Sequence, residues 1–328
     1  MEYWAHIDGE RVQTLKEHLF GAAKLAGDFA DRFGKREWGY SCGMLHDLGK
    51  YSEAFQEKIR TDSNKRVDHA TAGAKVCLEK GGFYSFLSYC IAGHHAGLPD
   101  YGTSSDGESS PTLMGRSKKR IEDYSEYWKE IEIPELKTPP FDPSKSPDPN
   151  FSLSFFIRMI YSCLVDADFL DTENFMKEGH TEREAGESLE VLLKKLEAYI
   201  SGWLGNQDRE TVNGRRTEIL KHCLECGERK PGIFQLTVPT GGGKTVASLA
   251  FALRHAVKNG MDRVIYVIPY TSIIEQNAEV FRKILGDENV LENHYNVDYE
   301  SSEELKPMQL ASENWDKPVV VTTNVQFF

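Results

Sequence analysis

The chain has 328 residues, of which 40% are hydrophobic and 27% charged; this composition predicts a globular protein of about two domains and excludes disordered and fibrous classes. Acidic side chains outnumber basic ones in both parts of the chain, and the net charge is −12. This excludes a broad basic surface for nucleic acid. A polyanionic substrate would have to be attracted locally, by metal ions or helix N-termini. The first ten residues lack the features of a signal peptide, and no apolar run approaches the ~18 residues of a membrane span. Most of the six cysteines lie in apolar, helix-like segments, so we expect a cytoplasmic protein with reduced thiols and no membrane partner.

The first part of the chain is predicted to be all-α. Apolar residues recur at helical spacing in Leu19–Phe33 and Trp38–Lys58. The pattern then changes to a glycine- and serine-rich loop at Gly102–Thr112, a short charged helix at Gly115–Glu130 and a proline-rich stretch at Pro134–Pro149. We interpret these three segments as a surface excursion.

Helices resume at Phe151–Phe175 and Glu182–Leu204. The predicted domain boundary falls within Ile200–Asp208, where the helical pattern stops. We therefore expect one domain over residues 1–205 and a second over residues 206–328.

The second domain has a different pattern. A helix at Gly214–Glu225 precedes a β-prone run at Gly232–Val238, and a glycine-rich turn leads into a helix at Lys244–Lys258. Two further buried strands are predicted at Arg263–Ile268 and Pro318–Thr322. Strand, helix and strand in this order predict a parallel α/β sheet.

The central motif of the first domain is the run His46-Asp47-Leu48-Gly49-Lys50. On a helix, Lys50 would lie on the same face as His46 and Asp47. Imidazole and carboxylate groups are metal ligands, and a nearby lysine would suit a phosphate. A single His-Asp pair is weak support for a metal site.

Four further histidines strengthen this interpretation: His18, His69, His94 and His95, each in or beside a predicted helix. Any one of them alone is more often an ordinary surface or core histidine, but the set predicts a metal cluster. A last carboxylate is expected from the helix around Ala167. Asp166 and Asp168 flank its buried stripe on opposite sides, so periodicity does not choose between them.

In combination, these motifs resemble the HD nuclease domain of the CRISPR-associated nuclease–helicases, the effector enzymes of type I systems. The resemblance covers residues 1 to about 205 and includes Asp68-His69-Ala70-Thr71-Ala72-Gly73-Ala74 and Ala167-Asp168. It implies an all-α HD domain with a two-metal site that cuts single-stranded DNA. The family pattern favours Asp168 over Asp166, and the phrase Leu164–Glu173 is similar to the I-C-like branch.

The roles that this resemblance implies can be written residue by residue. Asp47 would bridge the two ions, with His18, His46 and Asp168 serving one and His69, His94 and His95 the other. Lys50 would neutralise charge on the phosphate, so Asp47 and Lys50 are the expected catalytic residues. An imidazole-rich site favours Mn, Fe, Co or Ni over Mg, which prefers oxygen ligands.

The second domain contains a phosphate-loop motif, Thr240-Gly241-Gly242-Gly243-Lys244-Thr245, expected between a strand and a helix. Its backbone N–H groups would cradle the phosphates of ATP, Lys244 would reach the terminal oxygens and Thr245 would hold Mg²⁺. Val238 stands where the strict pattern has its first glycine, and we interpret the motif as a variant, because the form Pro-Thr-Gly-x-Gly-Lys-Thr is typical of superfamily-2 helicases. Two stretches, Tyr266–Gln276 and Val321–Phe328, resemble helicase motifs that touch the DNA backbone.

Neither later strand candidate ends in the Asp-Glu pair that a helicase ATPase uses. We therefore expect a partial first RecA-like lobe that follows a whole nuclease domain, with no ATP turnover from these residues alone. The run His222-Cys223-Leu224-Glu225-Cys226 has half the spacing of a zinc site and is better interpreted as a helix end.

The leading functional prediction is a metal-dependent single-strand DNase of CRISPR interference that acts with an RNA-guided surveillance complex. In an intact protein it would be coupled to an ATP-driven helicase. Two other functions remain open at this point: an HD phosphohydrolase that acts on nucleotides or cyclic nucleotides, and a module that binds DNA or a CRISPR complex without turnover.

Overall fold

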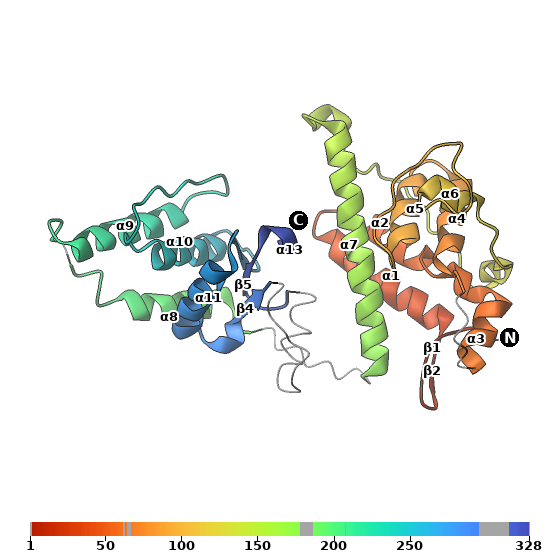
Figure 1. The fold of residues 1–328 in the computed structure, drawn as a ribbon, viewed down its shortest axis with the longest axis horizontal. Helices are drawn as coiled ribbons and strands as arrows, with labels where there is room; N and C mark the ends of the chain where they lie inside the picture. The colour runs from red at the N-terminus through yellow and green to blue at the C-terminus, as the bar shows by residue number, and fades with distance from the viewer. Residues whose placement is uncertain are drawn as a thin grey trace. The chain divides into compact units, whose positions relative to one another are not determined.

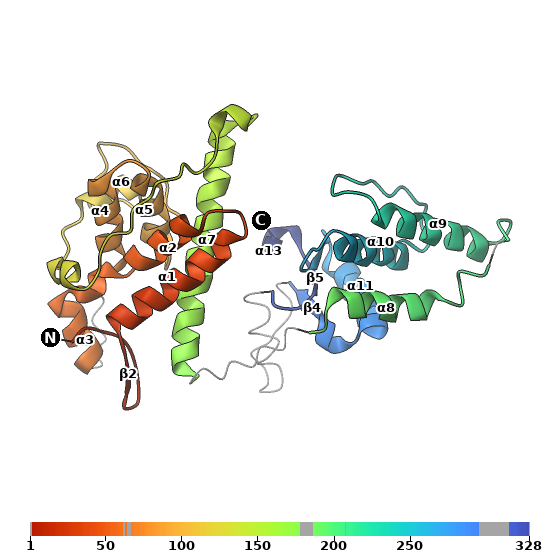
Figure 2. The ribbon, with the colours of Figure 1, turned by 180° about the vertical axis from the view of Figure 1, so that it is seen from behind.

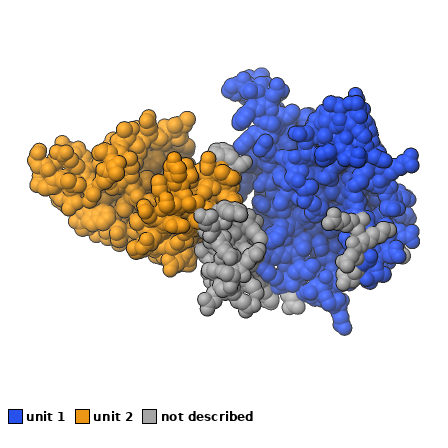
Figure 3. Space-filling view, viewed as in Figure 1, with its two compact units in different colours: residues 1–181 blue, residues 182–328 orange. Residues whose placement is uncertain are grey.

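The computed structural model describes residues 2–61, 63, 67–177, 186–206, 208–294 and 315–327. The chain divides into two compact units, residues 1–181 and residues 182–328 (Figure 3). Unit 1 is mainly helical and unit 2 contains a parallel sheet with helices, so the predicted order of an all-α domain followed by an α/β domain is confirmed. Within the described residues, no helix combines the length and apolar character that crossing a membrane requires.

Unit 1 opens with a β-hairpin that the sequence analysis missed. Strands β1 (Trp4–Asp8) and β2 (Arg11–Thr14) pair antiparallel and project from the start of α1 (Leu15–Asp31) (Figures 1 and 2). Thr14 ends the hairpin and caps the helix, because its side chain accepts from the backbone N–H of Glu17 while the Glu17 carboxylate accepts from the backbone of Thr14. Helix α1 therefore begins four residues before the predicted start at Leu19.

The predicted helix Trp38–Lys58 is wrong as a single element. The structure has α2 (Arg36–Leu45), the 3-10 turn η1 (Leu48–Tyr51) and α3 (Glu53–Thr61) in its place. The break falls on His46 and Asp47, and Asp47 has φ −111° and ψ 25°, outside helical values. The metal-site motif thus lies at the end of a helix instead of along one.

The remainder of unit 1 surrounds this break. Helix α4 (Ala70–Lys80) packs on α5 (Tyr84–Gly93), and the long helix α7 (Pro149–Met176) contacts α1, α2 and α5. The predicted helix Gly115–Glu130 is wrong in its middle, because α6 (Leu113–Lys118) and the 3-10 turn η2 (Ser125–Lys129) are separate. A further 3-10 turn, η3 (Pro143–Lys145), lies in the proline-rich stretch.

Unit 2 begins earlier than the predicted boundary at residue 205. Helix α8 (Leu189–Ile200) lies within the range that the sequence analysis gave to the first domain, and residues 182–185 of the helix predicted there lie outside the described residues. Leu192, Leu196 and Ile200 of α8 are fully buried in one core with residues of α10 (Lys244–Lys258). This shared apolar core assigns α8 to unit 2.

The sheet of unit 2 has the order β3-β5-β4, all parallel. Strands β3 (Val264–Val267) and β5 (Val319–Thr322) match the two later predicted strands, whereas β4 (Val290–Asn293) was not predicted. The other elements of this unit are α9 (Val212–Gly227), α11 (Thr271–Leu285), η4 (Asp287–Asn289) and α13 (Asn324–Phe327).

The predicted strand Gly232–Val238 is wrong, because this segment pairs with no described strand. Most of its apolar side chains are exposed, including Ile233 and Leu236, whereas Val238 is buried. A β-prone run becomes a strand only when a neighbour supplies ladder hydrogen bonds, so its propensity alone did not decide its structure.

Candidate metal centre

The candidate site lies in unit 1, where α1, the end of α2, the start of α4, the end of α5 and the middle of α7 converge. Asp47 is at its centre and its side chain is only 1% exposed. The structure brings all seven expected ligands into two groups, and the candidate ligand atoms within each group lie within 4.8 Å of one another. Asp47 belongs to both groups: its Oδ2 atom faces the histidines of the first group and its Oδ1 atom those of the second.

The first group contains His18, His46, Asp47 and Asp168, and it is largely buried. The Nε2 atom of His18 lies 3.5 Å from Asp47 Oδ2 and 3.3 Å from Asp168 Oδ1. The corresponding distances from His46 Nε2 are 3.4 and 3.5 Å. Two imidazoles therefore point their outer nitrogens at the same pair of carboxylates.

The second group contains Asp47, His69, His94 and His95 and is more open, since His95 is exposed and His69 half-buried. Asp47 Oδ1 lies 3.4 Å from His94 Nε2 and 3.7 Å from His69 Nε2. The Nε2 atoms of His69 and His95 are 2.8 Å apart. The site is therefore open to solvent on the side of this second group.

Hydrogen bonds fix which nitrogens face the centre. The Nδ1–H groups of His46 and His94 donate to the carbonyls of Gly43 and Ile91, each at 2.7 Å. In a neutral imidazole this leaves Nε2 as an acceptor with a lone pair directed at the carboxylates. Lone pairs on nitrogen and oxygen repel each other unless a proton or a cation lies between them.

Buried polar atoms without partners indicate whether the cluster suits a metal ion. Among the described residues, His18 Nε2, His46 Nε2, His94 Nε2 and Asp47 Oδ1 are buried without a hydrogen-bond partner. Buried polar groups are seldom left in this state. Nitrogen and oxygen acceptors that converge in this number fit divalent transition ions.

The electrostatics of the first group favour positive charge. Burial alone would lower the pKa values of His18 and His46, but the neighbouring carboxylates raise them to about 9 and about 10. Burial alone would raise the pKa of Asp47. The positive charges of Lys50 and His46 outweigh the effect of burial and hold the pKa of Asp47 well below its usual range. Bound cations would replace the protons that the imidazoles otherwise retain.

The imidazoles of the second group behave differently. Burial lowers the pKa of His69, and burial with the charge of His94 lowers the pKa of His95 to about 4. Neutral imidazole is the form that ligates a metal. These side chains therefore do not need to lose a proton to bind an ion at neutral pH.

Lys50 remains beside Asp47 despite the break in the helix. Its Nζ atom lies 2.7 Å from Asp47 Oδ2, and its side chain is 6% exposed. The helical pattern did not choose between Asp166 and Asp168. In the structure Asp168 lies in the cluster, and Asp166 belongs to neither group.

Three residues near the site were not expected from the sequence: His6, Gln13 and Asp171. His6 Nε2 lies 3.5 Å from Lys50 Nζ, and Asp171 contacts the Nδ1 atom of His18. Asp171 follows Asp168 by three residues on one helix, a spacing that predicts a shared face. His6 and Gln13 lie on the hairpin, for which no clear pattern was found.

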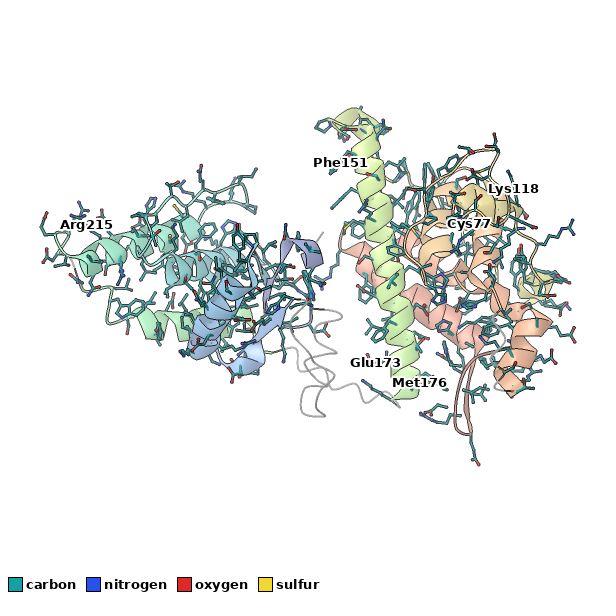
Figure 4. All side chains as sticks on the ribbon, in the orientation of Figure 1. Cys77, Lys118, Phe151, Glu173, Met176 and Arg215 are labelled. Atoms are coloured by element: carbon teal, nitrogen blue, oxygen red, sulfur yellow. The ribbon has the colours of Figure 1, made fainter. Side chains whose placement is uncertain are left out.

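The phosphate-loop residues lie at the start of α10 in unit 2. Gly241 and Gly243 have φ +80°, a conformation that favours glycine, and Gly243 precedes α10 without a side-chain cap. The Thr245 hydroxyl donates to Asn277 Oδ1 at 2.9 Å, and the Gly241 carbonyl accepts from Arg216 Nε at 2.8 Å. Arg215 and Arg216 lie on α9, where Figure 4 labels Arg215.

The cysteine pair of α9 does not form a metal site in the part of the chain that the structure describes. Cys226 Sγ lies 3.6 Å from His222 Nε2, but this pair belongs to no group of three ligands. Gly227 is the last residue of α9, in keeping with the predicted helix end.

Two family models match the chain. Residues 15–133 match the HD domain, and residues 195–328 match the type III restriction enzyme, res subunit. The curated CRISPR-associated nuclease/helicase Cas3 of Haloferax volcanii is 29% identical over 167 residues, which cover 40% of this chain and 18% of that protein.

Solved structures extend the similarity to the fold. The crystal structure of T. fusca Cas3 covers 99% of this chain with a TM-score of 0.54 at 16% identity, and its ATP complex covers 98% with the same score. The chain covers 43% of each T. fusca chain, less than half of their length. Together the two family models show an HD domain followed by a helicase-type region, and the chain is similar in sequence to a Cas3 nuclease/helicase and in fold to T. fusca Cas3.

Proposed function

We propose that unit 1 is a metal-dependent nuclease that cleaves single-stranded DNA in CRISPR interference. The observation that carries this proposal is Asp47, a buried carboxylate shared by two groups of ligands. The similarity to Cas3 supports DNA as the substrate and an RNA-guided surveillance complex as the partner. In a longer protein, unit 2 would contribute ATP-driven movement along DNA.

Each residue has a defined part in this proposal. Two bound divalent ions would polarise the phosphodiester and activate water. Asp47 supplies the negative charge between the two groups, and the Nε2 atoms of His18, His46 and His94 are held in place by their surroundings. Lys50 stabilises charge that develops on the phosphate oxygens.

The deciding experiment compares substrates in Mn²⁺. We expect the purified chain to cut circular single-stranded DNA and to leave free nucleotides and cyclic nucleotides intact. Hydrolysis of nucleotides without DNA cleavage would instead assign a phosphohydrolase. Metal-independent DNA binding without cleavage in Mn²⁺, Co²⁺ or Ni²⁺ would assign a binding module.

Metal preference gives a second prediction. EDTA should stop cleavage, and Mn²⁺, Co²⁺ or Ni²⁺ should restore it better than Mg²⁺, because five of the seven proposed ligands are imidazoles. The measurement is the initial rate on a short labelled single strand at equal concentrations of each ion. Full restoration by Mg²⁺ alone would contradict the proposed ligand set.

The third prediction separates the units. We expect Lys244→Ala to leave cleavage of a short single strand unchanged with or without ATP, because Lys244 lies in unit 2 and all the proposed metal ligands lie in unit 1. In a protein with a complete helicase, the same change should stop long-range degradation of duplex DNA. The measurement is a paired nuclease time course, with folding checked by circular dichroism.

Lys258→Ala is the matched control, since Lys258 is an exposed lysine at the opposite end of α10. A large loss of single-strand cleavage in Lys244→Ala but not in the control would mean that the phosphate loop takes part in cleavage.

A further inference from the structure

Asp171 contacts the proposed ligand His18 on the side of its imidazole ring that faces away from the cluster. It lies on α7 and its Oδ2 atom is 2.8 Å from His18 Nδ1, while His18 Nε2 faces Asp47 and Asp168 on the other side of the ring. Asp171 belongs to neither ligand group. It therefore acts on the cluster through His18.

His18 differs in this respect from His46 and His94, whose Nδ1 atoms donate to backbone carbonyls. A carboxylate that accepts from Nδ1–H fixes the tautomer with Nε2 free, and its negative charge makes Nε2 a stronger donor of its lone pair to a metal. The first group thus contains one imidazole with a dedicated carboxylate partner.

Two features hold Asp171 in this position. Gln13 on β2 donates from Nε2 to the same Oδ2 atom at 2.8 Å. Gly21 on α1 leaves the space for the carboxylate, because a Cβ atom at residue 21 would lie 1.9 Å from Asp171 Oδ1. The hydrogen bond from Gln13 restrains the carboxylate, and the missing side chain at Gly21 gives it room to face His18.

The hairpin is itself tied to α7. Arg11 on β2 donates to the backbone carbonyls of Phe175 and Met176, at the end of α7 that Figure 4 marks with the labels Glu173 and Met176. This contact keeps the strand that carries Gln13 against the helix that carries Asp171. The hairpin and the helix therefore support His18 together.

We propose that Asp171 is a positioning residue for His18, held by Gln13 and accommodated by Gly21, and that it sets the metal affinity of the His18–His46–Asp168 group but not that of the His69–His94–His95 group. The inference rests on the proposed two-metal site, and its test measures metal binding separately from cleavage.

The experiment titrates Co²⁺ into the metal-free full chain and follows its absorption bands, with calorimetry in Mn²⁺ as a second reading. We expect two equivalents in the wild type. Asp171→Ala should weaken one of them by about 10- to 100-fold and leave the other unchanged. Asp171→Asn should recover part of the loss, because the amide oxygen still accepts from Nδ1–H but carries no charge.

Gly21→Ala tests the same contact without altering the carboxylate, and we expect it to reproduce Asp171→Ala. Gly27→Ala is the matched control on the same helix, where the nearest atom to an added Cβ would be 3.3 Å away. Gln13→Leu should give a smaller loss than Asp171→Ala, and it keeps the test open if Gly21→Ala fails to fold.

The double variant Gly21→Ala/Asp171→Ala distinguishes positioning from general packing. Because the added methyl acts by displacing Asp171, the double variant should bind Co²⁺ no more weakly than Asp171→Ala alone. Additive losses would assign Gly21 a separate packing role and overturn its part in the inference.

The remaining outcomes are distinct. A folded Asp171→Ala variant that binds both Co²⁺ ions with wild-type affinity overturns the inference and leaves the nuclease function standing. A wild type that binds two ions and spares single-stranded DNA removes the nuclease function and leaves the inference standing. A wild type that binds fewer than two Co²⁺ ions overturns the inference.

Discussion

Asp47→Ala should abolish cleavage of single-stranded DNA, with a loss well beyond the roughly 100-fold that removal of an outer partner of a metal ligand costs. Asp47 is the one carboxylate common to both ligand groups; it is buried, and its Oδ1 atom has no hydrogen-bond partner. Without it, two cations would face each other with no negative charge between them. His46→Ala should have nearly the same effect.

A second consequence follows for stability. Lys50 lies 2.7 Å from Asp47 Oδ2 and is buried, so Asp47→Ala leaves an ammonium group without its carboxylate. Removing one partner of a buried pair costs about 3–5 kcal/mol. We therefore expect the variant to unfold at lower denaturant concentration as well as to lose activity.

The measurement combines initial rates in saturating Mn²⁺, metal content and urea unfolding. Asp28→Ala is the control, since Asp28 is a partly exposed aspartate on α1 that pairs with Arg36 away from the cluster. Asp47→Ala protein with near-wild-type DNase activity, in a preparation free of contaminating nuclease, would rule out the two-metal site.

Much of the candidate site was predictable because its histidines and aspartates stand in short, recognisable sequence motifs. Their side chains meet wherever those motifs face one cavity. Asp166 and Asp168 show the limit of this reasoning. Both flank the buried stripe of α7, and only the position of that helix against α1 and α2 brings Asp168 to the cluster.

The two residues that support Asp171, Gln13 and Gly21, could not be predicted from periodicity. Gln13 lies on a strand of four residues, and its partner Asp171 is 158 residues away in the chain. Short hairpins with few apolar residues give little alternation, so the pairing of β1 with β2 has no strong local signal. Gly21 is important because of a contact with another helix, which its own sequence context does not reveal.

The fold was predicted best where helices have a strong apolar stripe. Lys244–Lys258 has the predicted bounds, whereas Gly232–Val238 is β-prone and forms no strand. Helical hydrogen bonds are made within the segment, but a strand depends on a neighbour elsewhere in the chain. After the break that follows α2, η1 contacts α4, a neighbour that the local sequence does not reveal.

That contact leads to the last prediction. An added Cβ atom at Gly49 would lie 2.3 Å from the carbonyl oxygen of His69 and 2.5 Å from its Cα atom. These are backbone atoms that cannot turn aside, so Gly49→Ala must separate η1 from the start of α4. His69 would move away from Asp47, and we expect loss of one metal ion and most of the cleavage activity.

Gly49 does not have a positive φ, so the expected cost comes from crowding and not from backbone conformation. Overpacking of this kind destabilises by about 1–3 kcal/mol. The measurements are Co²⁺ stoichiometry, initial rate and urea unfolding. Gly107→Ala is the control, because that glycine also has an ordinary φ and an added Cβ meets no atom within 4 Å. A Gly49→Ala variant that binds two ions and cuts DNA at the wild-type rate would show that the close approach of η1 to His69 does not hold the second group in place.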